Sequence, residues 1–192
     1  KDTEKLAETI HKAFEVAGSG RPGPVLVDVP KDVQFASGRY TKKKEINKNF
    51  IKKEPPIDLN MLDEAISRLE LAERPIIYSG GGVINSGQSA VNSLRNLVAS
   101  TNFPITSTLM GLGSYPASGK NWLGMLGMHG TYEANMSMHD CDFMLCVGAR
   151  FDDRITGRID AFSPNSYKVH LDIDPSSINK NITVDAPLIG DV

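Results

Sequence analysis

The chain has 192 residues, enough for one domain or for one domain and part of another, since domains usually contain about 100–150 residues. Hydrophobic residues make up 40% and charged residues 23%, a globular composition that excludes a wholly disordered or fibrous chain. The formal net charge of −2 gives no general attraction to nucleic acid or to anionic membranes. The longest near-continuous apolar stretch, residues 143–149, is far shorter than the roughly 20 residues of a membrane span. We therefore expect a soluble protein that binds neither nucleic acid nor membrane.

Cysteine and histidine are too sparse for a disulfide framework or a metal centre. The two cysteines are Cys141 and Cys146, a usage that favours a reducing compartment. The four histidines form no HxxxH or HExxH pattern, so we predict no structural metal. The chain starts at Lys1 without a signal peptide, and we interpret this start as a cut inside a longer polypeptide.

The first segment predicts one helix followed by one strand. Apolar residues recur at helical spacing over residues 6–17, and Gly18 and Gly20 follow as stop signals. After a turn rich in Pro and Gly, the β-branched run at residues 25–30 is typical of a short buried strand. Residues 36–58 lose this periodicity and carry lysine runs and a Pro-Pro pair, which indicates a linker.

Beyond the linker, strand patterns alternate with helical ones. Asn60 is a candidate N-cap for a helix that ends before Pro75. We expect helices at about residues 90–98 and 132–138, and a glycine-rich loop at residues 109–116. The predicted strands are residues 75–79, 104–108, 143–147 and 167–174, with a fifth that begins at residue 187. This alternation predicts a Rossmann-like, doubly wound α/β fold, a parallel sheet with helices on both faces.

Each predicted strand ends in residues that suit an anionic ligand, and in such sheets ligands bind outside the carboxyl ends of the strands. Glycines allow close backbone approach, arginine makes bidentate contacts with phosphate, and an acid can accept from a ribose hydroxyl. These strand-end residues are Gly80, Gly81 and Gly82; Thr108, Leu109 and Met110; Gly148, Ala149, Arg150 and Asp152; Asp172; and Gly190 and Asp191. A dinucleotide lying across this edge would use all of them.

Each signal has a plain structural alternative. The glycine run is not GxGxxG, because Asn85 stands where the third glycine would be, so it is equally well a simple turn. Asp152, Asp153 and Arg154 on their own are more typical of a loop salt bridge than of a site. His129 alone is as well explained as a core or capping histidine.

Four longer segments then resemble one family. They are residues 126–135 (LGMHGTYEAN), 148–154 (GARFDDR), 22–33 (PGPVLVDVPKDV) and 108–113 (TLMGLG). Taken in chain order, and over nearly the whole chain, they closely resemble the catalytic subunit of the acetolactate synthase (acetohydroxyacid synthase) family. The resemblance implies that residues 1–35 are the last helix and strand of a pyrimidine-binding domain, and that residues 59–192, after the linker, are the central FAD-binding domain.

Such enzymes depend on thiamine diphosphate and Mg²⁺. They condense two 2-keto acids, pyruvate with pyruvate or 2-ketobutyrate, with loss of CO₂, towards valine, leucine and isoleucine, and their FAD does no net redox work in this reaction. The resemblance implies that Arg154 holds the carboxylate of the second keto acid and that Met128 lies beside it. It also adds His129, Gly130, Thr131 and Ile173 to the flavin site formed by the strand-end residues above.

The catalytic parts of the family are not found in this sequence. No GDG is followed at about 25–30 residues by an Asn, the family pattern for Mg²⁺ and the cofactor diphosphate, and the activating glutamate would fall before Lys1. We therefore assign no catalytic residue and predict that the chain alone is inactive. Other FAD-containing thiamine enzymes, of the pyruvate oxidase or glyoxylate carboligase type, remain alternatives, as does a non-catalytic nucleotide-binding module. An NAD-dependent enzyme would need a complete GxGxxG.

The resemblance also implies partners and a location. The parent protein would be a homodimer or homotetramer, with a small regulatory subunit as a further partner. Its lysine-rich composition favours the bacterial cytoplasm, or an organelle if the source is eukaryotic.

Overall fold

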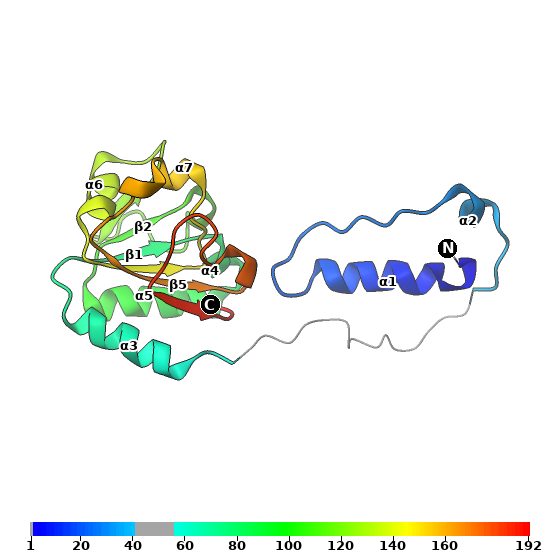
Figure 1. The fold of residues 1–192 in the computed structure, drawn as a ribbon, viewed down its shortest axis with the longest axis horizontal. Coiled ribbons are helices and arrows are strands. Elements are labelled where there is room, and N and C mark those ends of the chain that lie inside the picture. The colour runs from blue at the N-terminus through cyan, green and yellow to red at the C-terminus, as the bar shows by residue number, and fades with distance from the viewer. Residues whose placement is uncertain (1, 41–55) are drawn as a thin grey trace. The chain divides into compact units, whose positions relative to one another are not determined.

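Two units make up the chain, Lys1–Glu54 and Pro55–Val192, and we describe each by itself (Figure 1). The computed structural model describes residues 2–40 and 56–192. Most of the predicted linker, residues 36–58, falls outside these ranges.

Residues 2–40 contain the predicted helix but not the predicted strand. After the short 3₁₀ turn η1 (Thr3–Lys5), helix α1 runs over Leu6–Ala17 and ends at Gly18, which confirms the helical pattern. Residues 25–30 form no strand, and Leu26 is 93% exposed. A strand needs a neighbour for its backbone hydrogen bonds, and no other strand lies in residues 2–40. The helix α2 (Lys31–Phe35) follows instead.

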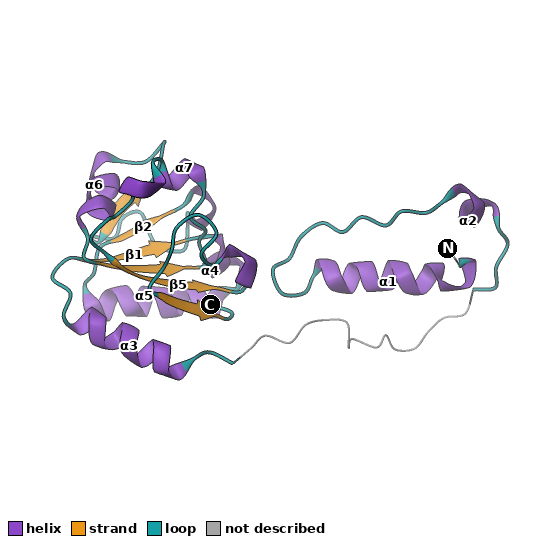
Figure 2. Cartoon of the chain, viewed as in Figure 1, coloured by secondary structure: helices purple, strands orange, loops and turns teal. Residues whose placement is uncertain are grey.

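A six-stranded, all-parallel sheet organises residues 56–192 (Figure 2). Its order, β3-β2-β1-β4-β5-β6, is that of the doubly wound dinucleotide-binding fold and confirms the predicted fold class. The strands are β1 (Pro75–Ser79), β2 (Ile105–Ser107), β3 (Trp122–Met125), β4 (Phe143–Val147), β5 (Tyr167–Asp172) and β6 (Ala186–Ile189). Strand β3 was not predicted, because it is a short, half-buried edge strand interrupted by Gly124 at a φ of +94°.

Helices cover both faces of this sheet (Figure 1). They are α3 (Leu59–Glu70), α4 (Gly81–Asn85), α5 (Gln88–Thr101), α6 (Tyr132–Asp140) and α7 (Asp153–Thr156), with 3₁₀ turns η2 (Leu109–Gly111), η3 (Ile159–Ala161) and η4 (Pro175–Ser177). Helix α3 begins at Leu59, one residue before the predicted cap Asn60. Asp58 caps it, because its carboxylate accepts from the amides of Asn60 and Met61.

Successive side chains of each strand point to opposite faces of the sheet, which divides the core into two layers. In β1, Ile76 and Tyr78 pack with α6 on one face, whereas Ile77 packs with α5 on the other. Helix α3 covers a third cluster around Phe143 and Val169. Both faces of the sheet are therefore sealed by apolar side chains, and the loops at its carboxyl edge carry the polar groups.

None of the helices in residues 2–40 and 56–192 combines the length and the apolarity needed to cross a membrane.

Candidate functional site

The predicted ligand edge contains the topological switch point of the sheet. Strands β1 and β4 are neighbours, although β2 and β3 intervene in the sequence, so the connections leave this point in opposite directions. Such folds bind ligands in the crevice outside the carboxyl ends at the switch point. The turn at residues 80–82 follows β1 and the turn at residues 148–150 follows β4, so the structure brings these two predicted segments together.

Glycine is required here because the two turns touch through their backbones. A Cβ on Gly80 would lie 2.3 Å from the Gly148 carbonyl oxygen, and one on Gly82 would lie 2.6 Å from the Gly148 Cα. The Gly80 amide donates to Val147 O at 2.9 Å and the Gly82 amide donates to Gly148 O at 2.8 Å. The amides of Gly80 and Gly82 therefore bond within the protein and hold the two turns together.

The segment after β2 adds an apolar surface beside this turn. Thr108 Oγ1 accepts from the Gly111 amide at 3.0 Å and so begins η2. Leu109 and Met110, within η2, are 66% and 75% exposed. A Cβ on Gly81 would lie 3.0 Å from Met110 Cβ, so these residues border the glycine turn directly.

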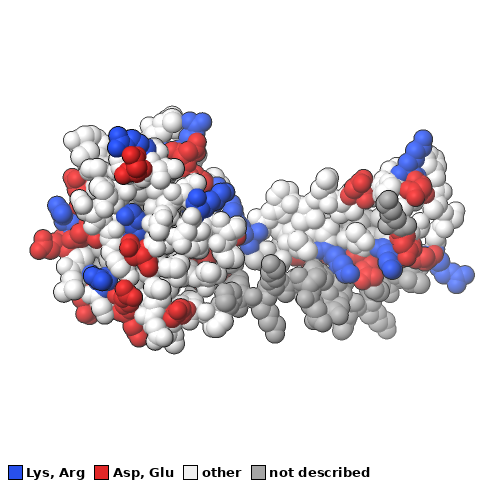
Figure 3. Space-filling view, in the orientation of Figure 1, with Lys and Arg blue, Asp and Glu red and all other residues white. Residues whose placement is uncertain are grey.

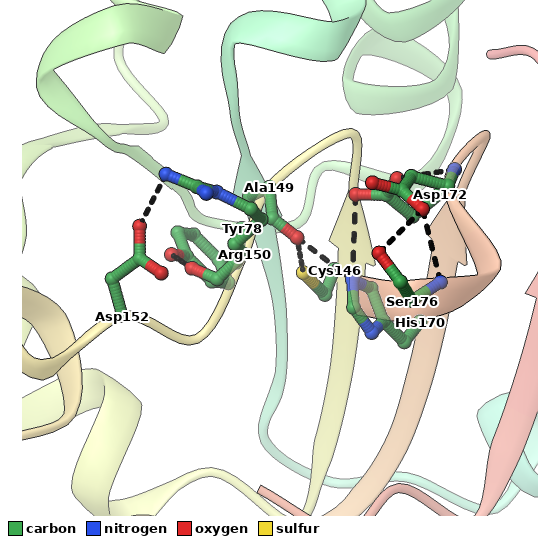
Figure 4. A network of polar contacts seen from close by, with 9 residues as sticks. Tyr78, Cys146, Ala149, Arg150, Asp152, His170, Asp172 and Ser176 are labelled. Atoms are coloured by element: carbon green, nitrogen blue, oxygen red, sulfur yellow. Dashed lines mark hydrogen bonds and ion pairs between the residues drawn. The ribbon is translucent and has the colours of Figure 1, made fainter. Parts of the chain in front are cut away.

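The segment after β4 supplies a cation. Arg150 is exposed, and its Nη2 pairs with Asp152 Oδ2 at 2.7 Å (Figure 4). Both side chains remain about two-fifths exposed, so water screens the pair and an anionic ligand can compete for the guanidinium. The salt bridge expected among residues 152–154 instead involves Arg150.

Three buried side chains lie beneath this segment. Tyr78 Oη donates to Arg150 O at 2.8 Å, while Cys146 Sγ and His170 Nε2 lie 3.3 and 2.7 Å from Ala149 O (Figure 4). Burial raises the pKa values of the Tyr78 hydroxyl and the Cys146 thiol well above their usual range and lowers the pKa of His170. Sequence reasoning missed this group, although all three residues lie near the carboxyl ends of their strands. Tyr78 and Cys146 are next to last in β1 and β4, and His170 is third from last in β5.

The acids after β5 and β6 are held by the protein itself. Asp172 is buried, and its Oδ1 accepts from the Asp174 amide at 2.8 Å. Ile173 follows it, half-buried. The Gly190 amide donates to Asp172 O at 3.1 Å, and the carboxylate of Asp191 accepts from the Ser86 hydroxyl at the end of α4. The two segments therefore meet each other, and Asp191 meets the glycine-turn helix.

Met128 and Arg154 form a second group. Arg154 Nη1 lies 3.5 Å from Met128 Sδ, and the Met128 amide donates to Arg154 O at 2.9 Å. Asn135, which was not predicted, accepts from the Gly127 amide at 2.8 Å and donates to the Gly127 carbonyl at 3.0 Å. This side chain fixes the peptide before Met128.

The residues that follow Met128 lead from an exposed loop into helix α6. His129 is exposed, so its alternative reading as a core histidine is wrong. Gly130 packs tightly, since a Cβ there would lie 2.5 Å from Met125 O. Thr131 caps α6 by accepting from the Ala134 amide.

A cavity of about 550 Å³ lies at the opposite edge of the sheet, around the amino ends of β1 and β2. Arg74, Phe103 and Cys141 are among its lining residues, and none of the predicted site residues lines it. In the described residues no three His, Cys, Asp or Glu side chains gather as a metal site. Over residues 56–192, Figure 3 shows basic and acidic side chains interspersed on the visible face. The carboxyl edge therefore remains the candidate site.

Comparisons with known proteins agree on a single family. Residues 62–192 match the family described as thiamine pyrophosphate enzyme, central domain. The whole chain is 42% identical to an acetolactate synthase large subunit of Buchnera aphidicola subsp. Acyrthosiphon pisum, of which it covers 34%. It is also 42% identical to acetolactate synthase isozyme 3 large subunit of Escherichia coli, of which it covers 33%, and to probable acetolactate synthase 2, chloroplastic, of Oryza sativa, of which it covers 28%. The chain thus spans about a third of the length of these curated relatives.

Proposed function

The chain belongs to the thiamine pyrophosphate enzyme family, since its residues 62–192 match the central domain of that family, and we propose that it is part of an acetolactate synthase large subunit. The relatives that bear this name align with all of the chain at 42% identity. The parent protein would condense two 2-keto acids with loss of CO₂. Residues 1–35 would then belong to its pyrimidine-binding domain and residues 59–192 to its central domain.

In this proposal the carboxyl edge of the sheet binds FAD. The observation that carries it is the exposed Arg150 beside the glycine-packed switch point. A pyrophosphate suits the guanidinium, and an apolar ring system suits the exposed surface of Leu109 and Met110. When bound, FAD supplies a flavin that does no net redox work in the condensation. The residues of the predicted flavin site keep this role as a proposal.

Arg154 would bind the carboxylate of the second keto acid. Its guanidinium is exposed and lies against the Met128 thioether, which is a weak hydrogen-bond acceptor and carries no charge of its own. A cation fixed in this way orients the acceptor and selects for a carboxylate.

Thiamine diphosphate and Mg²⁺ would bind to other parts of the parent protein. The sequence has no GDG followed by the Asn of the family pattern, and we assign no catalytic residue here. As further proposals, the parent is a homodimer or homotetramer, is joined by a small regulatory subunit, and works in the bacterial cytoplasm.

A flavin titration tests the cofactor proposal. Purified chain is titrated with FAD or FMN while flavin fluorescence is followed, and NAD is added as a competitor of bound FAD. We expect saturable binding of FAD and a loss of about tenfold or more in affinity for Arg150→Ala, since a charge-assisted contact is removed. The matched control is Arg158→Ala, because Arg158 is also exposed and pairs locally, with Asp160 at 2.8 Å. Equal losses in both variants would contradict the proposal.

Product analysis tests the reaction. The parent protein supplied with pyruvate, thiamine diphosphate and Mg²⁺ should form acetolactate, whereas the 192-residue chain should form none. Acetyl phosphate formed by the parent from pyruvate, inorganic phosphate and O₂, or tartronate semialdehyde formed from glyoxylate, would favour the related flavin-containing enzymes instead.

A further inference from the structure

A row of three buried side chains crosses the sheet beneath Arg150. Tyr78 on β1 is in register with Cys146 on β4, and Cys146 is in register with His170 on β5. All three side chains are fully buried. Because residues in register on neighbouring strands point to the same face, the row lies on the face that carries Phe151 and α6.

This row converges on two consecutive carbonyl groups. Cys146 and His170 both contact Ala149 O, and Tyr78 donates to Arg150 O (Figure 4). These carbonyls belong to the peptide units before and after the Arg150 Cα. Peptide units are planar, so fixing both of them fixes the two backbone dihedrals of Arg150 and with them the direction of its Cα–Cβ bond.

The imidazole of His170 has one tautomer that fits this role. Since a carbonyl oxygen can only accept, Nε2 must carry the proton that is donated to Ala149 O. The other ring nitrogen, Nδ1, is buried with no hydrogen-bond partner in the described part of the chain. The titratable groups that face this ring are Asp172, whose Oδ2 lies 3.8 Å from Nε2, and the neutral Cys146 and Tyr78. Charging the ring would bury an unpaired N–H, so the imidazole is neutral.

We propose that Tyr78, Cys146 and His170 are positioning residues that set the backbone of Arg150 and thereby hold its guanidinium at the flavin site. This proposal rests on the proposed function for its ligand. An apolar row of the same shape would fill the same space, but it would leave the Ala149 and Arg150 carbonyls without these donors and the turn free to rotate.

Flavin affinity tests the proposal through variants that keep the shape of the row. Tyr78→Phe removes one hydroxyl, and we expect FAD to bind about fivefold more weakly. His170→Leu should weaken binding about tenfold, whereas His170→Gln, whose amide can still donate to Ala149 O, should restore affinity to within twofold of the unaltered chain. The matched controls are Tyr132→Phe and His139→Leu, both at exposed positions, and they should bind as the unaltered chain does.

A second measurement does not depend on flavin. At pH 7.5, imidazole ¹⁵N shifts of the labelled chain should show His170 as the Nε2–H tautomer with Nδ1 unprotonated. An Nδ1–H tautomer would overturn the proposal, and so would FAD affinities within twofold of each other for the unaltered chain, Tyr78→Phe and His170→Leu. If the unaltered chain binds no FAD, the flavin proposal fails for this chain, and the tautomer alone decides whether the row holds the turn. Tyr78→Phe keeps the affinity test decisive even if His170→Leu does not fold.

Discussion

Residues 2–40 and 56–192 carry similar apolar patterns, yet only the second range buries them. In the first, Val33 is the one buried hydrophobic residue, while Phe14 and Phe35 are 75% and 79% exposed. In the second, apolar residues on both faces of the sheet are almost fully buried. A helical pattern is enough to predict a helix such as α1, but burial requires neighbouring elements.

Hydrogen bonds differ between the two ranges in the same way. In residues 56–192 they join distant segments: the Asp142 carboxylate accepts the amides of Glu73 and Arg74, 69 and 68 positions away. In residues 2–40 the Arg39 amide makes one such link, to the Glu4 carboxylate. The bonds around η1 and α1 instead join residues two to four positions apart. We therefore expect a substitution to lower the free energy of unfolding most where distant segments pack tightly against each other. The single tryptophan, Trp122 on β3, reports the unfolding of residues 56–192.

The largest effect is expected where the two turns of the switch point touch. Gly80→Ala places a Cβ within 2.4 Å of the Ala149 Cα and 2.3 Å of Gly148 O, and neither backbone atom can move without opening the sheet. We expect a loss of about 3 kcal/mol in the free energy of unfolding, measured in urea by Trp122 fluorescence. The control is Gly81→Ala, whose Cβ meets the side chain of the exposed Met110. An equal loss in both variants would show that the close approach is not the cause.

The next effect is expected at the clamp on the Met128 loop. Asn135→Ala removes two hydrogen bonds to Gly127, and we expect a loss of about 2 kcal/mol, since each bond contributes about 1 kcal/mol. The same urea titration measures it. Asn92→Ala is the control, because the Asn92 side chain is exposed and accepts from Gln88, one turn away on α5. A loss no larger than that of the control would contradict the clamp.

A smaller effect is expected from pH. Burial lowers the pKa of His170 in the folded chain, so between the folded and unfolded pKa values the unfolded chain binds more protons. Stability from this group is therefore present above the unfolded value of about 6.5 and is lost as pH falls below it. We expect His170→Gln to flatten the decline in unfolding free energy between pH 7.5 and 5. An unchanged decline would assign the acid sensitivity to other groups.

The fold could be predicted because local pattern and tertiary environment agree there. Strands β1 and β4 are continuous apolar runs, as both faces of a parallel sheet require, and their predicted bounds are confirmed. Where the environment decides, the sequence pattern is not enough. The prediction of a strand at residues 25–30 was wrong, because this segment has no strand neighbour within residues 2–40, and β3 was not predicted, because Gly124 interrupts it.

The candidate site could likewise be predicted only where strand ends decide which residues meet. That Gly80, Gly148 and Arg150 come together follows from their places after β1 and β4 and could be predicted. The donors beneath them could not, because Tyr78, Cys146 and His170 are ordinary strand residues until the sheet order puts them in register. The partner of Asp152 likewise depends on the path of the turn that carries Arg150.

The smallest effect is expected in residues 2–40. Phe14→Ser replaces a large apolar side chain that is 75% exposed on α1, so the stability of residues 56–192 should change by less than about 0.5 kcal/mol in urea titrations followed by Trp122. Phe143→Ser is the matched control, since the same replacement at a side chain only 2% exposed should cost about 3 kcal/mol or more. A loss above about 1 kcal/mol for Phe14→Ser would show that the two units stabilise each other. A helix with an exposed apolar face contributes to stability only through the surface that covers it, so the exposed face of α1 should leave the sheet's stability unchanged.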